Sequence, residues 1–129
     1  MLPVVLKPTI LKQEQREFYF ENGYLLLESI VPQKWLELLR STTNNKINES
    51  KNLSESNDIF DLDKGHSFEN PRLRRLSSPN DHDDNYWKYA SEFLPNIISD
   101  LVGPNVKFHH SKLNFKWSKG GAEVKWHQD

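Results

Sequence analysis

The last six residues of the chain, VKWHQD, place a histidine and a carboxylate two positions apart. On a β-strand such side chains project from the same face, so His127 and Asp129 could share one cation. An imidazole with a carboxylate suits a divalent first-row metal such as iron, manganese or zinc. Two ligands are too few for a tight site, and short motifs often occur by chance. A polar, solvated strand end explains the same residues.

The stretch before this motif, residues 106–117, alternates polar and apolar residues, which is typical of a strand with one buried face. Leu113, Phe115 and Trp117 share the face that is predicted to pack on a core. The opposite face is predicted to meet ligands or water, and it carries His110, Lys112, Asn114 and Lys116.

A turn is predicted at Gly120-Gly121, between this strand and the strand of His127. A tight two-residue hairpin would set Asn114 opposite His127 and Lys112 opposite Asp129. A longer or bulged loop would shift these pairs.

Helices are predicted to precede these strands. Thr9 is placed to cap a helix that ends at Gly23, with a short strand over residues 24–30. Pro32 fits the first turn of a second helix, which is expected to fray near residues 41–45. Two further helical pieces are predicted over residues 85–94 and 95–103, and Gly103 closes the second.

Residues 41–85 contain few apolar side chains, so a long loop, mobile or ordered by a cofactor, is expected there. Among the histidines of this stretch, His66 and His82 lie in polar sequence and are predicted to be solvated. The length of 129 residues fits one domain.

Charge and composition exclude several function classes. Seventeen Lys and Arg against eighteen Asp and Glu give a formal charge of −1 without a basic stripe, so no nucleic acid partner is expected. The absence of cysteine leaves imidazole and carboxylate as metal ligands. No signal peptide or membrane span is recognisable, so a soluble, cytoplasmic protein without a membrane partner is expected. The oligomeric state is undetermined.

Larger motifs occur in the order FYFENGYLLLESIVP, GHSFENPRLRRL, LVGPNVKFHHSKLNFKW and VKWHQD. Together they resemble the phytanoyl-CoA dioxygenase-like family of Fe(II)/2-oxoglutarate-dependent oxygenases over nearly the whole chain from about Leu11. The resemblance implies an α+β fold, with amino-terminal helices and the first strands of a double-stranded β-helix, the cupin-like jelly roll. It further implies that residues 1–129 form the amino-terminal part of one such domain, helical over about 9–103 and with barrel strands over about 105–129.

The resemblance also assigns site residues. His127 and Asp129 match two members of a facial triad of two histidines and one carboxylate, which binds Fe(II) and leaves positions for 2-oxoglutarate and O2. Asn114 stands thirteen residues before His127, at the spacing of a family asparagine that contacts 2-oxoglutarate. In the stretch NPRLRRL, Arg75 is the choice over Arg72 and Arg74 for contacting co-substrate or substrate. Two secondary candidates, which also read as solvated charges, are Lys112 and Lys116.

The implied reaction hydroxylates a small organic or acyl substrate and oxidatively decarboxylates 2-oxoglutarate to succinate and CO2. The family pattern also needs a distal histidine and an arginine that pairs with 2-oxoglutarate. Neither follows Asp129 here, so the 129 residues are expected to be an inactive amino-terminal fragment. His110 does not match the position of the distal ligand.

Two alternatives remain open. The fold could serve as a non-catalytic binding module for a partner or small acid. Alternatively, His127 and Asp129 could belong to a zinc or manganese hydrolase with another histidine.

Overall fold

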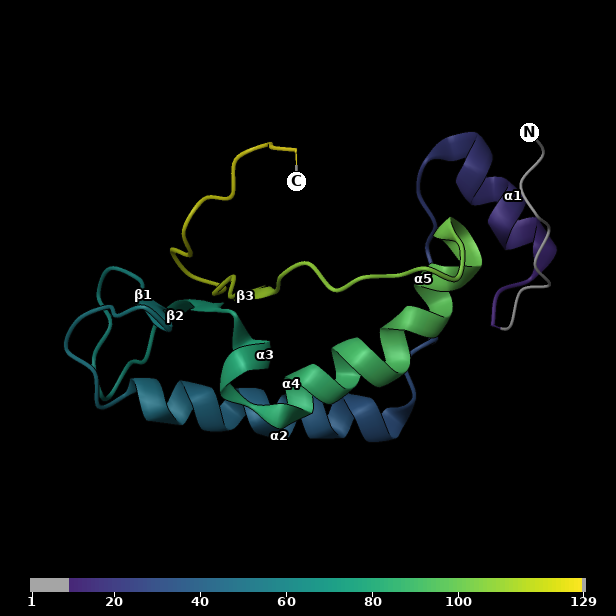
Figure 1. The fold of residues 1–129 in the computed structure, drawn as a ribbon. Helices are drawn as coiled ribbons and strands as arrows, with labels where there is room; N and C mark the ends of the chain where they lie inside the picture. Colours follow the sequence, from purple (N-terminus) through teal and green to yellow (C-terminus); the bar gives the residue numbers. More distant parts are fainter. Residues whose placement is uncertain (1–9, 129) are drawn as a thin grey trace.

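The computed structural model describes residues 10–128, and residues 1–9 and 129 lie outside the described part. Along the chain the elements are α1 (Gln13–Asn22), α2 (Gln33–Ser50), β1 (Phe60–Leu62), β2 (Leu73–Ser77), α3 (Pro79–His82), α4 (Asp84–Lys88), the π-helix η1 (Tyr89–Phe93), α5 (Leu94–Val102) and β3 (Lys112–Asn114). The sheet lies over one end of the long helix α2, and the carboxyl-terminal segment arches over the other side of the sheet (Figure 1). Among residues 10–128, no helix combines the length and the apolar character needed to span a bilayer.

The first helix, α1, begins later than predicted. Its N-cap is Lys12, whose backbone N–H donates to Gln15 Oε1 at 2.8 Å, and the predicted cap, Thr9, lies outside the described residues. Gly23 ends α1 with φ of 79°, and its N–H donates to the Tyr19 carbonyl, as predicted. The strand predicted over 24–30 is wrong: this segment has no partner strand, and Leu26 is 74% exposed.

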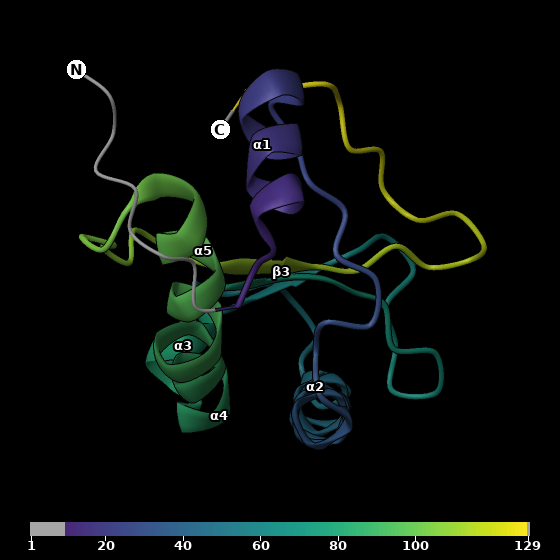
Figure 2. The ribbon, with the colours of Figure 1, turned by 90° about the vertical axis from the view of Figure 1, so that its right-hand side faces the viewer.

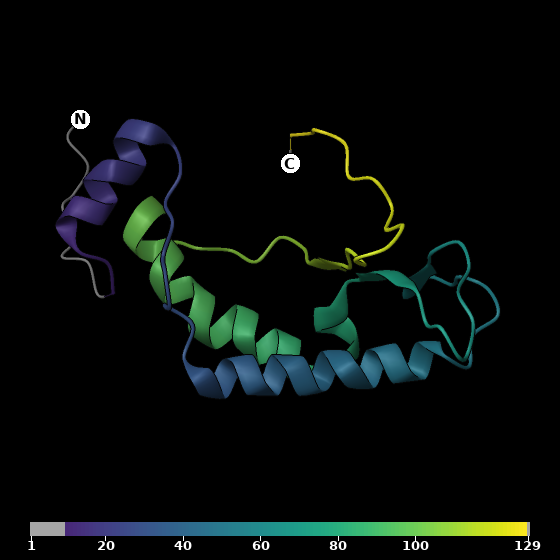
Figure 3. The ribbon, with the colours of Figure 1, turned by 180° about the vertical axis from the view of Figure 1, so that it is seen from behind.

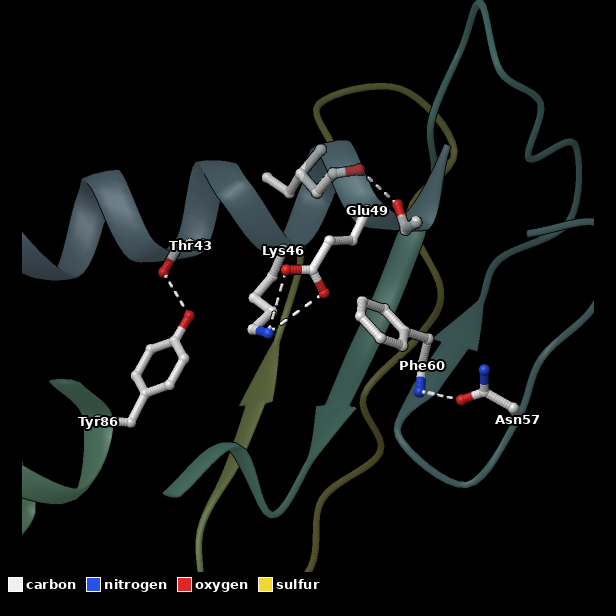
Figure 4. A network of polar contacts seen from close by, with 8 residues as sticks. Thr43, Lys46, Glu49, Asn57, Phe60 and Tyr86 are labelled. Atoms are coloured by element: carbon white, nitrogen blue, oxygen red, sulfur yellow. Dashed lines mark hydrogen bonds and ion pairs between the residues drawn. The ribbon is translucent and has the colours of Figure 1, made fainter. Parts of the chain in front are cut away.

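Helix α2 begins directly after Pro32, which is its N-cap and not, as predicted, a residue of its first turn, and the helix continues without fraying to Ser50. The prediction that it frays near residues 41–45 is wrong because α4 holds these polar residues. Thr42 Oγ1 accepts a hydrogen bond from Asn85 at 2.9 Å, and Thr43 shares one of 2.9 Å with the Tyr86 hydroxyl (Figure 4).

The two predicted helical pieces form one nearly continuous run of α4, η1 and α5, which Figure 2 shows beside α2. Pro95 explains the π-turn: it lacks an N–H, and its ring would clash with the preceding helical turn. Gly103 ends the run at φ of 100°, as predicted. At the far end, the Asp100 carboxylate accepts the backbone N–H groups of Ile10 and Leu11 at 2.7 and 2.8 Å, which docks the start of α1 onto α5.

The sheet is antiparallel, in the order β1-β2-β3. Phe60, Leu76 and Leu113 face one another across the strands and belong to a buried cluster centred on Leu73, against which Ile47 of α2 packs. Phe115 and Trp117 pack against the same cluster, which confirms the predicted apolar face. The alternate row, on the face turned away from this core, is Asp61, Arg75 and Asn114.

Two predictions about the strands are wrong. Residues 41–85 are not a long loop, because they contain half of α2, the strands β1 and β2 and most of the core. No hairpin forms at Gly120-Gly121 either: Asn114 pairs with Arg75 instead of His127, and residues 115–128 are in no strand.

The observed class is therefore helices plus a small antiparallel sheet, in agreement with an α+β fold. Strands β1 and β2 lie inside the region expected to be helical, and β3 is the one strand within residues 105–128. The jelly roll stays a prediction.

Candidate active site

A cavity of about 150 Å³ is lined by residues of β2, of β3 and of the carboxyl-terminal segment. Figure 3 shows how that segment arches over the sheet. Its walls come from three separate parts of the sequence. The lining residues are Arg74, Arg75, Lys112, Asn114, Phe115, Lys116, Ala122, Glu123, Val124 and His127. The cavity thus gathers every sequence-predicted site residue except Asp129, which lies outside the described residues.

Strand β3 positions three of these residues by its alternation. Lys112 and Asn114 stand on the exposed face, and Lys116 continues the same face beyond the strand. Asn114 lies directly opposite Arg75, which puts the two side chains on the same face of the sheet. The ammonium of Lys116 donates to the Ala122 carbonyl and so ties β3 to the segment that carries His127.

Two arginines enter the cavity from β2. In the register of β1 and β2, Asp61 pairs with Arg75 and Leu62 with Leu73, so Arg74 is an extra residue in a β-bulge. As a result Arg74 and Arg75 both reach the Asp61 carboxylate, at 3.8 and 3.0 Å from Oδ2. Within the described part of the chain, the buried Nε of Arg75 has no hydrogen-bond partner.

The other two candidate arginines separate in space. Arg72 does not line the cavity, since its guanidinium donates to the Lys119 carbonyl at 2.7 Å. Arg74 does line it, although sequence reasoning passed it over. Nothing in the letters NPRLRRL reveals the bulge that brings two consecutive arginines to one site.

The His127 ring is oriented by its own segment. Its Nδ1 lies 2.7 Å from the Lys125 carbonyl, and because a carbonyl oxygen only accepts, Nδ1 is the donor. In the neutral ring the lone pair is then on Nε2, and metal-binding histidines are often oriented in this way by a carbonyl that accepts from the other ring nitrogen. Within residues 10–128 no three His, Asp or Glu side chains gather at a metal site. Asp129 lies outside these residues, so the pair of His127 and Asp129 as metal ligands stays a prediction.

The other histidines lie apart from His127. His109 and His110 contact each other edge to face, with ring centroids 4.5 Å apart, and line a second cavity of about 740 Å³. Apolar side chains such as Trp87, Ile98 and Phe108 form much of that wall. His82 is exposed, as predicted. None of these rings lines the cavity of His127.

His66 differs from its prediction as a solvated ring. Its Nδ1 accepts the Arg72 backbone N–H at 2.8 Å, which leaves Nε2 to donate to the Ser50 carbonyl at 2.9 Å. The half-buried ring therefore joins the end of α2 to the start of β2, a structural role that the polar sequence around it did not indicate.

Two tyrosines in the wall of the larger cavity have altered acidity. Burial raises the pKa of Tyr86, and the carboxylates of Asp83 and Glu49 raise it further, while the hydrogen bond to Thr43 lowers it. Burial also raises the pKa of Tyr89. Both phenols are therefore neutral at physiological pH.

Comparison with known proteins identifies the family of the chain. Residues 19–129 match the family described as phytanoyl-CoA dioxygenase (PhyH), and the chain belongs to that family. Among individual proteins, a probable alpha-ketoglutarate-dependent hypophosphite dioxygenase of Stutzerimonas stutzeri is 26% identical over 117 residues. The match covers 90% of this chain but 41% of that relative, so the chain spans less than half of the relative's length. No solved structure gives a significant match.

Proposed function

We propose that the chain supplies the first part of the active site of an Fe(II)/2-oxoglutarate-dependent dioxygenase. The enzyme would hydroxylate a small organic or acyl substrate. One oxygen atom of O2 enters the product and the other enters succinate, which forms with CO2 from 2-oxoglutarate. The observation that carries the proposal is the cavity shared by His127, Asn114 and the cations Arg75, Lys112 and Lys116.

The chemistry of this cavity fits 2-oxoglutarate, a small dianion. Arg75 offers a guanidinium, a group that binds carboxylates through paired N–H donors, and no described residue accepts a hydrogen bond from its buried Nε. The amide of Asn114, in the wall of the same cavity, adds a donor and an acceptor. Lys112 and Lys116 supply positive charge from the same wall. These groups would bind and orient the co-substrate.

Iron would be held by His127 and Asp129 together with a third ligand, and its chemistry when bound is the activation of dioxygen. The hydrogen bond from His127 Nδ1 to the Lys125 carbonyl fixes the ring in the orientation that a ligand needs. The name of the relative from Stutzerimonas stutzeri supports 2-oxoglutarate as co-substrate. We further propose that the 129 residues alone do not turn over, because a third ligand and a second arginine are needed.

The test uses the complete protein that carries this chain and measures succinate released with Fe(II) and 2-oxoglutarate. His127→Ala is expected to abolish release, whereas the exposed His82→Ala is its matched control and leaves it unchanged. Asn114→Ala is expected to raise KM for 2-oxoglutarate by about tenfold with little change in kcat, as for the loss of a ground-state contact. Binding of 2-oxoglutarate without any iron-dependent release would favour the non-catalytic binding module instead.

A further inference from the structure

The β-bulge at Arg74 changes which side chains the polar face presents. In regular pairing, consecutive residues of a strand point to opposite faces, so Arg74 and Arg75 would be separated. The extra residue lets both line the same cavity while Leu73 and Leu76 stay buried, 0% and 1% exposed. The strand thus keeps its core contacts and doubles the guanidinium groups at one point of the cavity wall.

One carboxylate serves both guanidiniums. Asp61 Oδ2 accepts a hydrogen bond of 3.0 Å from Arg75, while Arg74 approaches the same oxygen at 3.8 Å, an ion pair longer than a hydrogen bond. Two positive groups against one negative group leave a net positive charge. Among residues 10–128, the buried Arg75 Nε has no hydrogen-bond partner.

We propose that Arg74 and Arg75 form a two-guanidinium clamp for one oxyanion, and that Asp61 is the positioning residue that orients both. Guanidinium groups bind planar and tetrahedral oxyanions through pairs of parallel N–H donors. The clamp rests on the proposed function and extends it to Arg74 and Asp61. Its ligand is either a carboxylate of 2-oxoglutarate or an oxyanionic group of the substrate.

Binding to the 129-residue chain tests the clamp, followed by NMR during titration with 2-oxoglutarate or with inorganic phosphite. Arg74→Gln and Arg75→Gln are each expected to weaken binding of at least one of these anions by about tenfold, as for the loss of a charged hydrogen bond. Arg75→Lys keeps the positive charge but loses the paired N–H donors of the guanidinium, so its anion binding is also expected to be weaker than that of the parent chain. The matched control is Arg40→Gln, an exposed arginine of α2 that changes the net charge equally.

Asp61→Asn is the most informative variant, because the two possible roles of Asp61 predict opposite changes in the affinity for anions. If Asp61 only reduces the positive potential, its neutralisation strengthens anion binding. As a positioning residue, its neutralisation is expected to weaken binding about threefold or more, since the guanidiniums lose their common anchor. Urea unfolding of each variant checks that the fold is intact. Stronger binding by a folded Asp61→Asn chain, or unchanged binding by Arg74→Gln, would overturn the clamp.

The two anions separate the possible sources of the ligand. A loss confined to 2-oxoglutarate identifies the co-substrate carboxylate, and a loss confined to phosphite identifies an anionic substrate group. Either outcome supports the clamp. If phosphite binds through Arg74 but neither this chain nor the complete protein binds 2-oxoglutarate, the clamp stands and the proposed function fails. If the complete protein releases succinate in an iron-dependent reaction but Arg74→Gln changes the binding of neither anion, the proposed function stands and the clamp fails.

Discussion

The burial of residues 41–77 and of residues 112–128 is the opposite of what their sequences suggest. The first region is poor in apolar side chains, yet it holds the core residues Phe60, Leu73 and Leu76. The second has the clearest alternation, yet beyond Trp117 its side chains are largely exposed, and Trp126 is fully so. Placement against a neighbouring element, more than apolar content, decides burial.

The contrast has a physical cause in the partners of each region. In residues 41–77, the side chains of Phe60, Leu73 and Leu76 pack against Ile47 of α2 and Leu113 of β3, so these few apolar side chains lose nearly all contact with water. In residues 112–128 one face meets that core, through Leu113, Phe115 and the Trp117 indole N–H, which donates to the Leu73 carbonyl at 2.8 Å. The other face borders the polar cavity and stays available for ligands.

The largest expected effect comes from deleting the centre of the core. Leu73→Ala is expected to lower the free energy of unfolding by about 2–5 kcal/mol, because the smaller side chain loses apolar contacts and leaves an empty space in the buried core. Urea unfolding followed by tryptophan fluorescence measures it. Val124→Ala, at a half-exposed site of the second region, is the control and should stay within about 0.5 kcal/mol of the parent. Equal losses at both sites would remove the contrast between the regions.

A smaller loss is expected from His66→Ala, which removes the link between α2 and β2. The substitution leaves the Ser50 carbonyl and the Arg72 N–H without their side-chain partner, at a cost of about 1–3 kcal/mol. The exposed His82→Ala is the matched control. Hydrogen exchange at Arg72 should also accelerate in the first variant. No difference between the two histidine variants would show that the ring is a solvated group after all.

The smallest effect concerns the hydrogen bond that holds the polar part of α2. Tyr86→Phe is expected to cost about 0.5–1.5 kcal/mol at neutral pH by removing the bond to Thr43. The exposed Tyr24→Phe serves as control.

The same tyrosine predicts a loss of stability in alkali. Burial raises the pKa of Tyr86 above its ordinary value of 10.0, so above this pH the unfolded chain releases the proton first. The stabilisation is full below pH 10.0 and is lost as the pH rises through the folded-state pKa. Denaturant midpoints measured across this range should fall less steeply for Tyr86→Phe than for the parent. Identical slopes would contradict the burial of the phenol.

The sequence predicted the two faces of β3 better than it predicted where the strands lie. The alternation around Asn114 correctly gave the polar and apolar faces, because side-chain direction in an extended segment follows from local geometry. The hairpin register failed, since it assumed a two-residue turn. In the structure a side chain on Gly121 would meet the Trp117 carbonyl, with Cβ 2.9 Å from that oxygen, so the backbone folds back there.

Arg74 and Asp61 are site residues that local sequence patterns do not predict. Arg75 could be chosen from the stretch NPRLRRL by resemblance, but its companion depends on an irregular register between β1 and β2. A bulge results from pairing and packing along both strands together, and no short stretch of sequence specifies it.

The sequence by itself determined the helix ends at Gly23 and Gly103, the polar face of β3, the family, and the spacing of His127 and Asp129 as candidate ligands. Each depends on neighbours along the chain or on a pattern of letters. The tertiary structure alone decided that β2 lies beside β3, that the sparse region forms the core, and that Arg74 joins Arg75 at the cavity. These features depend on contacts between residues far apart in sequence, whose free energy is set by the whole packed arrangement.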